Sequence, residues 1–136
     1  MAKNVLVDAG FLIALLNRRD AHHHWAAAQA AVYSPPWRTS ESVLSEAFHL
    51  LGRNGAPILG ELLRRKALLV EFDLPENLDA VLKLIQKYSN VPMGLADACL
   101  VRMTEVVADP LVLTTDSDFQ IYRRNGRQTV LCVTPR

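Results

Sequence analysis

Apolar residues fall into two kinds of segment, which alternate from one end of the chain to the other. Longer stretches with apolar residues three and four positions apart predict helices, and short continuous apolar runs predict buried strands. We place strands near residues 4–7, 37–39, 69–72, 111–114 and 129–133, and helices near 10–16, 20–33, 41–52, 57–66, 75–88 and 95–108. Strands that alternate with helices are typical of an α/β protein with a parallel sheet.

Proline and glycine mark the breaks between these elements. Ser34-Pro35-Pro36 and Gly52-Arg53-Asn54-Gly55 are predicted turns, and Ser89-Asn90-Val91-Pro92 is predicted to stop a helix. We find no internal repeat, low-complexity tract or linker, so residues 1–136 are interpreted as a single domain.

The composition indicates a folded protein, because 50% of the residues are hydrophobic and 21% are charged. Cys99 lies in a helical pattern and Cys132 in a short strand, which does not indicate a disulfide framework. The apolar stretch from Val5 to Leu16 is too short to span a bilayer, is interrupted by Asp8 and lacks a basic leader. We therefore expect a cytoplasmic protein that is neither exported nor inserted in a membrane.

Two acidic residues stand where apolar strands end. Asp8 follows the run Asn4–Val7, and Asp116 follows the run Leu111–Thr115. Parallel α/β sheets bind ligands at the carboxyl ends of their strands. These two carboxylates are therefore candidate site residues.

Two more acids lie on predicted helices, beside apolar stripes. Asp97 falls between Leu100 and Val101 on the helical wheel, and Glu46 falls on the shoulder of the stripe that contains Val43. Both are expected at the edge of a core. Four unpaired carboxylates there would be penalised by burial and would repel one another unless a cation joined them. Oxygen ligands suit Mg²⁺ or Mn²⁺.

The net charge of +1 conceals a basic surplus. Setting aside the four candidate acids leaves fifteen basic residues against ten acidic ones. Arg18-Arg19 and Arg123-Arg124 each follow an element that begins at a candidate acid, which makes them candidates for contact with nucleic-acid phosphates. The cluster Arg64-Arg65-Lys66 is interpreted at least as readily as the solvated face of a helix.

Other polar clusters have plainer interpretations. His22-His23-His24 cannot all ligate one ion, because adjacent helical residues point about 100° apart. Asp20 is interpreted mainly as a helix cap, with a supporting role near the site left open. His49 has no second helical ligand at zinc spacing. Trp25 and Trp37 are interpreted as core residues in preference to base-stacking residues.

Four segments of this sequence resemble the ordered acidic motifs of PIN-domain ribonucleases, and most closely those of VapC-like toxins from toxin–antitoxin pairs. The segments are Asp8–Leu16, Glu41–Ala47, Leu95–Ala98 and Thr114–Phe119. The resemblance spans nearly the whole chain. It implies a three-layer α/β/α sandwich around a mainly parallel sheet.

The resemblance also implies roles for individual residues. Asp8, Glu46, Asp97 and Asp116 would be the catalytic residues and would hold Mg²⁺ or Mn²⁺, with Thr114 and Asp118 in supporting positions. The implied activity is metal-dependent hydrolysis of RNA phosphodiester bonds, leaving a 5′-phosphate and a 3′-hydroxyl. The implied partners are a transfer or ribosomal RNA, a VapB-like antitoxin and a second copy of the chain.

This chain departs from the family pattern at two positions. Ala9 stands where many relatives have Ser or Thr, and Gly94 stands where relatives often have a polar or acidic residue. Neither departure removes a candidate ligand, so we expect an active site.

Other interpretations compete with that of a toxin. A free-standing RNA-processing nuclease would carry the same acids, and a catalytically silent PIN-like module could bind a partner through an acidic cleft. A receiver-like domain is disfavoured because Asp8 has no adjacent acidic partner. An aspartyl phosphatase is disfavoured because Gly10 stands where a second Asp would be needed.

Overall fold

The computed structural model describes residues 3–135 and contains a five-stranded sheet. The strands are β1 (Asn4–Val7), β2 (Trp37–Thr39), β3 (Leu68–Val70), β4 (Pro110–Leu113) and β7 (Cys132–Val133), in the spatial order β3-β2-β1-β4-β7. All four pairings are parallel. Residues 5–7 of β1 and 111–113 of β4 are buried, as expected for central strands covered on both faces.

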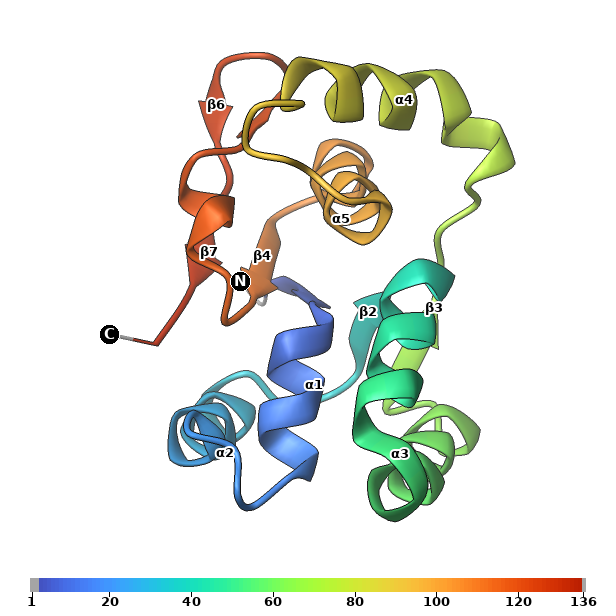
Figure 1. Ribbon diagram of the computed structural model, residues 1–136, viewed down its shortest axis with the longest axis vertical. Helices are drawn as coiled ribbons and strands as arrows, with labels where there is room; N and C mark the ends of the chain where they lie inside the picture. The colour runs from blue at the N-terminus through green and yellow to red at the C-terminus, as the bar shows by residue number, and fades with distance from the viewer. Residues whose placement is uncertain (1–2, 136) are drawn as a thin grey trace.

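Helices cover both sides of this sheet. Their bounds are α1 (Ala9–Leu16), α2 (His23–Val32), α3 (Glu41–Arg64), α4 (Leu78–Lys87) and α5 (Leu95–Val106), with short 3₁₀ segments η1 (Pro75–Asn77) and η2 (Ser117–Gln120). Figure 1 shows α4 and α5 at the top of the view and α1, α2 and α3 at the bottom, with β1 and β4 between them. The predicted α/β sandwich with a parallel sheet is confirmed.

The chain winds outward in both directions from β1. It first builds β1, β2 and β3 on one side, then returns through α5 to place β4 on the other side of β1. The boundary between β1 and β4 is therefore the point at which the strand order reverses. Ligands bind beside such a point, at the carboxyl ends of the strands. Asp8 and Asp116 follow the two strands that meet there.

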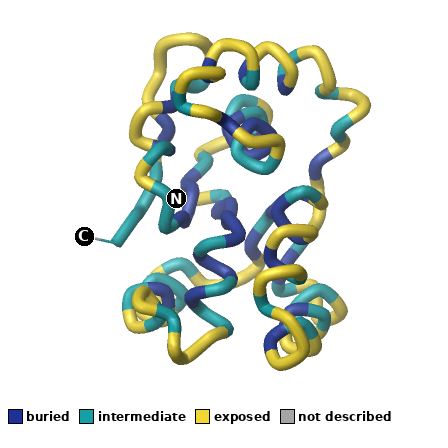
Figure 2. The backbone as a smooth tube through the Cα atoms, in the orientation of Figure 1, coloured by how far each residue is buried: buried dark blue, intermediate teal, exposed yellow. Residues whose placement is uncertain are grey.

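The buried residues form one core around the sheet and α5 (Figure 2). Below the sheet, the Phe11 ring packs edge-on against Trp37 at 5.3 Å and against Trp25 at 6.1 Å. Trp37 is buried and Trp25 is half-buried, which confirms their interpretation as core residues. Above the sheet, Tyr122 packs edge-on against Tyr88 and Phe119.

Several predicted boundaries were wrong. The helix expected from residue 20 begins at His23, because the Asp20 carboxylate accepts the His22 N–H in a turn that precedes the helix. The two helices expected within 41–66 are present and meet at Gly52, where φ is +62°, but the turn expected over 52–55 is only a kink, so that both helices belong to the continuous element α3. The helix expected over 75–88 begins as η1 and continues as α4.

The C-terminal region also differs from the prediction. The strand expected over residues 129–133 is divided between β7, at the edge of the main sheet, and a small antiparallel hairpin. The hairpin pairs β5 (Arg123–Arg124) with β6 (Gln128–Thr129). Strands of two residues are too short for a hydrophobic alternation to develop, so the pattern could not separate the two strands.

The histidines of α2 lie mainly on the surface. His22 and His24 are exposed, and a ring nitrogen of His23 is hydrogen-bonded to the Ala14 carbonyl at 2.8 Å. Among residues 3–135, none of the helices combines the length and the apolar character that crossing a membrane requires.

Candidate active site

Asp8 connects β1 to α1 and is buried, with 6% of its surface exposed. It caps α1, because its Oδ1 accepts the Ala9 N–H at 2.8 Å. Its Oδ2 accepts the hydroxyl of Thr114 at 2.7 Å. Each carboxylate oxygen therefore has a protein donor, which fixes the side chain at the carboxyl end of β1.

The burial of Asp8 has an electrostatic consequence. Removal from water raises the pKa of Asp8 from 3.8 to about 6, although the hydrogen bonds from Thr114 and Ala9 act in the opposite direction. The negative charges of Asp97 and Glu46 raise it further. Three of the four candidate acids therefore interact electrostatically at this point.

Asp97 lies in the first turn of α5 and is half-buried. Its Oδ2 accepts two hydrogen bonds, from the Gly94 N–H at 3.3 Å and from the Tyr122 hydroxyl at 3.2 Å. Burial raises the pKa of Asp97, and the charges of Asp116 and Glu46 add to this effect. Asp116, the fourth candidate acid, is thus linked to the other candidate acids through Asp97. We call Asp8, Glu46, Asp97 and Asp116 the acidic cluster.

The loop after β4 is organised by Thr114, which is fully buried. Its hydroxyl donates to Asp8 and accepts the Asp116 N–H at 2.9 Å. Asp116 in turn caps η2, since its Oδ1 accepts the Asp118 N–H at 2.9 Å. A single hydroxyl therefore connects the acid after β1 to the loop that carries the acid after β4.

Gly10 allows α1 to approach this loop closely. A Cβ at Gly10 would lie 2.0 Å from Oγ1 and 3.3 Å from Cβ of Thr115. Any larger residue at position 10 would press on the segment between Thr114 and Asp116. A glycine is needed here because of packing at the site.

Glu46 differs from its expected environment. The helical wheel predicts it at the edge of the core, but it is exposed on α3, whereas Val43 and Ala47 on the same helix are buried. Its charge nevertheless acts on both Asp8 and Asp97. Glu46 therefore lies on the solvent side of the acidic cluster.

The donor chemistry of the cluster fits a hard divalent cation. It consists of carboxylates, and burial and mutual repulsion already penalise the charged forms of Asp8 and Asp97, so a cation would relieve both effects. No three Asp, Glu, His or Cys side chains within residues 3–135 already stand close enough together to hold a metal ion. Asp97 is turned toward Gly94 and Tyr122, and Asp116 toward the Asp118 N–H.

The two arginine pairs have different surroundings. Arg18 and Arg19 are exposed beyond the end of α1. Arg123 donates to the carbonyls of residues 120–122, and Arg124 donates to the Thr104 carbonyl and to Gln128. The second pair therefore fastens η2, the hairpin and α5 together.

Sequence reasoning did not single out Tyr122. This side chain is fully buried, and its contact with Asp97 joins residues 25 positions apart. No local pattern marks such a contact. The only available signal was an aromatic residue shortly after the Asp116 motif.

The two departures from the family pattern leave backbone donors in place. The N–H of Ala9 donates to Asp8 and the N–H of Gly94 donates to Asp97. A Cβ at Gly94 would meet only Oδ2 of Asp97, at 3.9 Å. Both acids therefore keep a hydrogen-bonded backbone partner.

Comparison with known proteins agrees with this geometry. The family model described as "PIN domain" matches residues 5–125. The crystal structure of VapC20 from Mycobacterium tuberculosis, a sarcin-ricin loop cleaving toxin, matches with a TM-score of 0.75 and 23% sequence identity, over 86% of this chain and 93% of that chain. At this identity the structural likeness establishes the fold alone. Among the curated proteins, none matches this chain. The family match confirms the resemblance seen in the acidic motifs, and the chain belongs to the PIN-domain family.

Proposed function

We propose that this protein is an endoribonuclease that hydrolyses RNA phosphodiester bonds and depends on Mg²⁺ or Mn²⁺. The observation that carries the proposal is the meeting of Asp8 and the Asp116 loop, joined by the Thr114 hydroxyl, at the β1–β4 switch point. Asp97 and Glu46 lie near enough for their charges to act on Asp8. Membership of the PIN-domain family supports it. A buried carboxylate with further acids beside it is an unfavourable arrangement for stability alone, which favours a functional explanation.

Each acid has a role in this proposal. Asp8, Asp97, Asp116 and Glu46 would hold the cation. When bound, the cation would lower the pKa of a water molecule at the site and would offset the negative charge that develops on the phosphoryl oxygens. Thr114 keeps Asp8 oriented through its 2.7 Å hydrogen bond, and Asp118 donates its backbone N–H to Asp116. One of these carboxylates would accept the proton from the attacking water.

The biological role that we propose is that of a toxin in a toxin–antitoxin pair. The fold likeness to VapC20, a toxin that cleaves the sarcin-ricin loop, supports this choice. By the same analogy, the partners would be a transfer or ribosomal RNA, a VapB-like antitoxin and a second copy of the chain, all in the cytoplasm. Exposed loop bases of a folded RNA are the features that such a protein would recognise.

The test is an assay with purified, antitoxin-free protein and total cellular RNA, in Mg²⁺ or Mn²⁺, with and without EDTA. New 5′-phosphate ends are mapped by sequencing. Asp8→Asn is run beside the unaltered protein, with Asp73→Asn as a matched control, because Asp73 also accepts a backbone N–H but is exposed before η1.

Discrete ends that disappear with EDTA and with Asp8→Asn, but persist with Asp73→Asn, would support the proposal and identify the RNA. Absence of new ends under every metal condition, from folded protein, would overturn it in favour of a silent PIN-like binding module. Growth arrest on expression, relieved by a neighbouring gene, would distinguish a toxin from a free-standing nuclease.

A further inference from the structure

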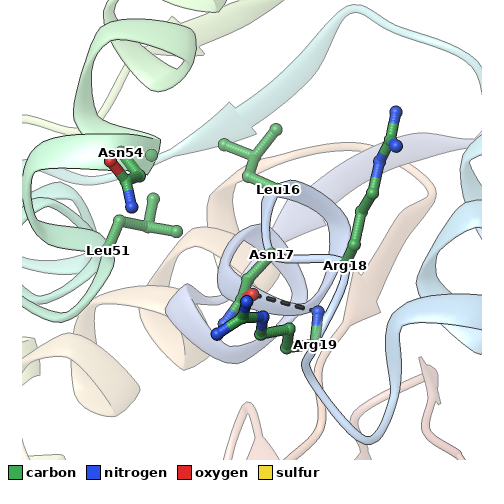
Figure 3. Close-up of a pocket in the computed structure, with 7 residues that line it drawn as sticks. Leu16, Asn17, Arg18, Arg19, Leu51 and Asn54 are labelled. Atoms are coloured by element: carbon green, nitrogen blue, oxygen red, sulfur yellow. Dashed lines mark hydrogen bonds between the residues drawn. The ribbon is translucent and has the colours of Figure 1, made fainter.

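A cavity of about 460 Å³ opens between the C-terminal end of α1 and the kink of α3 (Figure 3). The α1 side consists of residues 16–19, and the α3 side includes Leu51 and Asn54. Leu16 and Leu51 approach from opposite helices, and the polar groups of Asn17, Arg19 and Asn54 surround the opening between them. The cavity therefore combines an apolar base with a polar rim.

The rim is positively charged. Arg18 and Arg19 both line the cavity, and no acidic residue of the described chain lines it. Within residues 3–135, neither guanidinium is hydrogen-bonded to protein or paired with a carboxylate, whereas Arg38 pairs with Glu71 and Arg102 with Glu105. Arg19 lies beside the Asn17 side chain, whereas the Arg18 side chain extends away from both (Figure 3). Guanidinium and amide N–H groups without protein partners are donors that a phosphate accepts.

Local backbone structure sets the positions of these groups. Asn17 ends α1, and its Oδ1 accepts the Arg19 N–H at 3.0 Å, which fixes the turn that carries both arginines. On the other side, Gly52 bends α3 two residues before Asn54. The C-terminus of α1 contributes a partial negative charge of about one half, which the two full positive charges outweigh.

The cavity lies beyond the acidic cluster along the same two helices, at the C-terminal end of α1 and at the kink of α3. Asp8 caps the start of α1 and Asn17 its end, a separation of about 13 Å along the helix. On α3, Glu46 precedes the kink at Gly52 by about 9 Å, and Asn54 lies two residues beyond that kink. Figure 1 shows α1 and the part of α3 before its kink running alongside each other in the same direction. A chain laid along these helices would reach from the acids to the arginines.

We infer that this cavity binds a backbone phosphate of single-stranded RNA while the bond to be cleaved lies at the acidic cluster. The inference rests on the proposed nuclease function and adds a second point of attachment for its substrate. It assigns Arg18 and Arg19 to substrate binding and leaves Arg123 and Arg124 with their structural contacts. Such a site would favour RNA that is extended beyond the cleaved bond.

The experiment measures binding without cleavage. A fluorescein-labelled single-stranded RNA of about 12 nucleotides is titrated with the full chain in EDTA, by fluorescence anisotropy, at several salt concentrations between about 50 and 200 mM. The test variant is Arg18→Gln/Arg19→Gln. The matched control is Arg64→Gln/Arg65→Gln, which removes two adjacent exposed arginines from the far end of α3.

The test variant should bind the RNA roughly tenfold more weakly at low salt, and the slope of log affinity against log salt should fall by about 0.7 for each phosphate that the variant no longer binds. The control variant should change neither quantity. Equal affinity and slope in the test and control variants would overturn the inference and would point to an acidic protein segment as the occupant of the cavity.

The binding experiment tests this inference separately from the proposed function. The proposed function is tested by cleavage of total RNA by the unaltered protein. If cleavage occurs but the arginine variants bind alike, this inference fails and the nuclease proposal stands. If RNA binding depends on Arg18 and Arg19 but no metal condition gives cleavage, the phosphate site stands and the nuclease proposal fails.

Discussion

The hydroxyl of Tyr122 donates a hydrogen bond of 3.2 Å to Oδ2 of Asp97 from within a fully buried aromatic cluster. The Gly94 N–H donates to the same oxygen, so both protein donors act on Oδ2, and no donor among the described residues is hydrogen-bonded to Oδ1. Burial and the Asp97 charge raise the pKa of Tyr122, which keeps the phenol protonated as a donor. Tyr122 therefore orients the Asp97 carboxylate.

Removing the Tyr122 hydroxyl should weaken metal binding and cleavage, while the aromatic ring continues to fill its place in the core. We expect Tyr122→Phe to lower Mn²⁺ affinity and RNA cleavage by about 10- to 100-fold, as is usual when a residue that orients a metal ligand is removed. Metal affinity is measured by calorimetry and cleavage by the end-mapping assay.

Tyr88→Phe is the matched control for Tyr122→Phe. It removes a hydroxyl from the same aromatic cluster, but that hydroxyl accepts the Arg123 N–H at 2.8 Å and does not contact Asp97. Both variants should show a similar decrease in thermal stability. An equal decrease of metal affinity in the two variants would contradict a specific role for Tyr122.

The raised pKa of Asp8 predicts a pH-dependent stability. Between about pH 4 and pH 6, folded Asp8 retains a proton that the unfolded chain has released, so the free energy of unfolding falls as pH rises through this window. We expect Asp8→Asn to raise that free energy by about 2–3 kcal/mol near neutral pH, and by little near pH 4.

Urea unfolding of both proteins in EDTA at the two pH values checks this prediction. An equal increase in the free energy of unfolding of Asp8→Asn at both pH values would show that the increase does not come from the buried charge of Asp8. Added Mg²⁺ should stabilise the unaltered protein and leave Asp8→Asn unchanged, because ligand binding stabilises only the folded form that binds it.

The kink in α3 requires glycine at position 52. The backbone there has φ +62° and ψ −154°, which a residue with a side chain adopts only at a penalty of about 1–3 kcal/mol. Space is not limiting, since a Cβ at Gly52 would meet no atom within 4 Å. Gly52→Ala should therefore lower the free energy of unfolding by that amount, as measured by urea denaturation.

Gly60→Ala is the matched control for Gly52→Ala. Gly60 lies in the same helix, and a Cβ there would also meet nothing within 4 Å, but its backbone is not at positive φ. Alanine should stabilise the helix at this position by up to about 1 kcal/mol. Gly52→Ala should thus lower the free energy of unfolding and Gly60→Ala should raise it. A change of the same sign in both would contradict the role given to the positive φ of Gly52.

Arg124 is predicted to stabilise the fold. It is half-buried, and its Nε donates to the Thr104 carbonyl at 3.0 Å, which ties β5 to α5. We expect Arg124→Gln to lower the free energy of unfolding by about 1–3 kcal/mol, and to leave the salt dependence of RNA binding unchanged. A reduced salt slope in this variant, with normal stability, would instead make Arg124 a phosphate contact.

Local patterns were sufficient to locate β1, β2, β3 and β4 and two of the candidate acids. Asp8 and Asp116 each end a continuous apolar run, and strand ends of a parallel sheet meet at one edge whatever the details of the core. The environment of Glu46 was predicted less well, because a position on the shoulder of an apolar stripe becomes exposed or buried according to which helix packs beside it.

The sequence by itself determined the α/β alternation, the strand-end acids and the family, because each of these depends on residues close together in the chain. Only the tertiary structure decided that Tyr122 orients Asp97, that Thr114 bridges Asp8 and the Asp116 loop, and that Arg18 and Arg19 face a cavity while Arg123 and Arg124 bind carbonyls. These relationships join segments far apart in the chain, and their distances are set by how the helices pack on the sheet. No periodicity along the sequence records that packing.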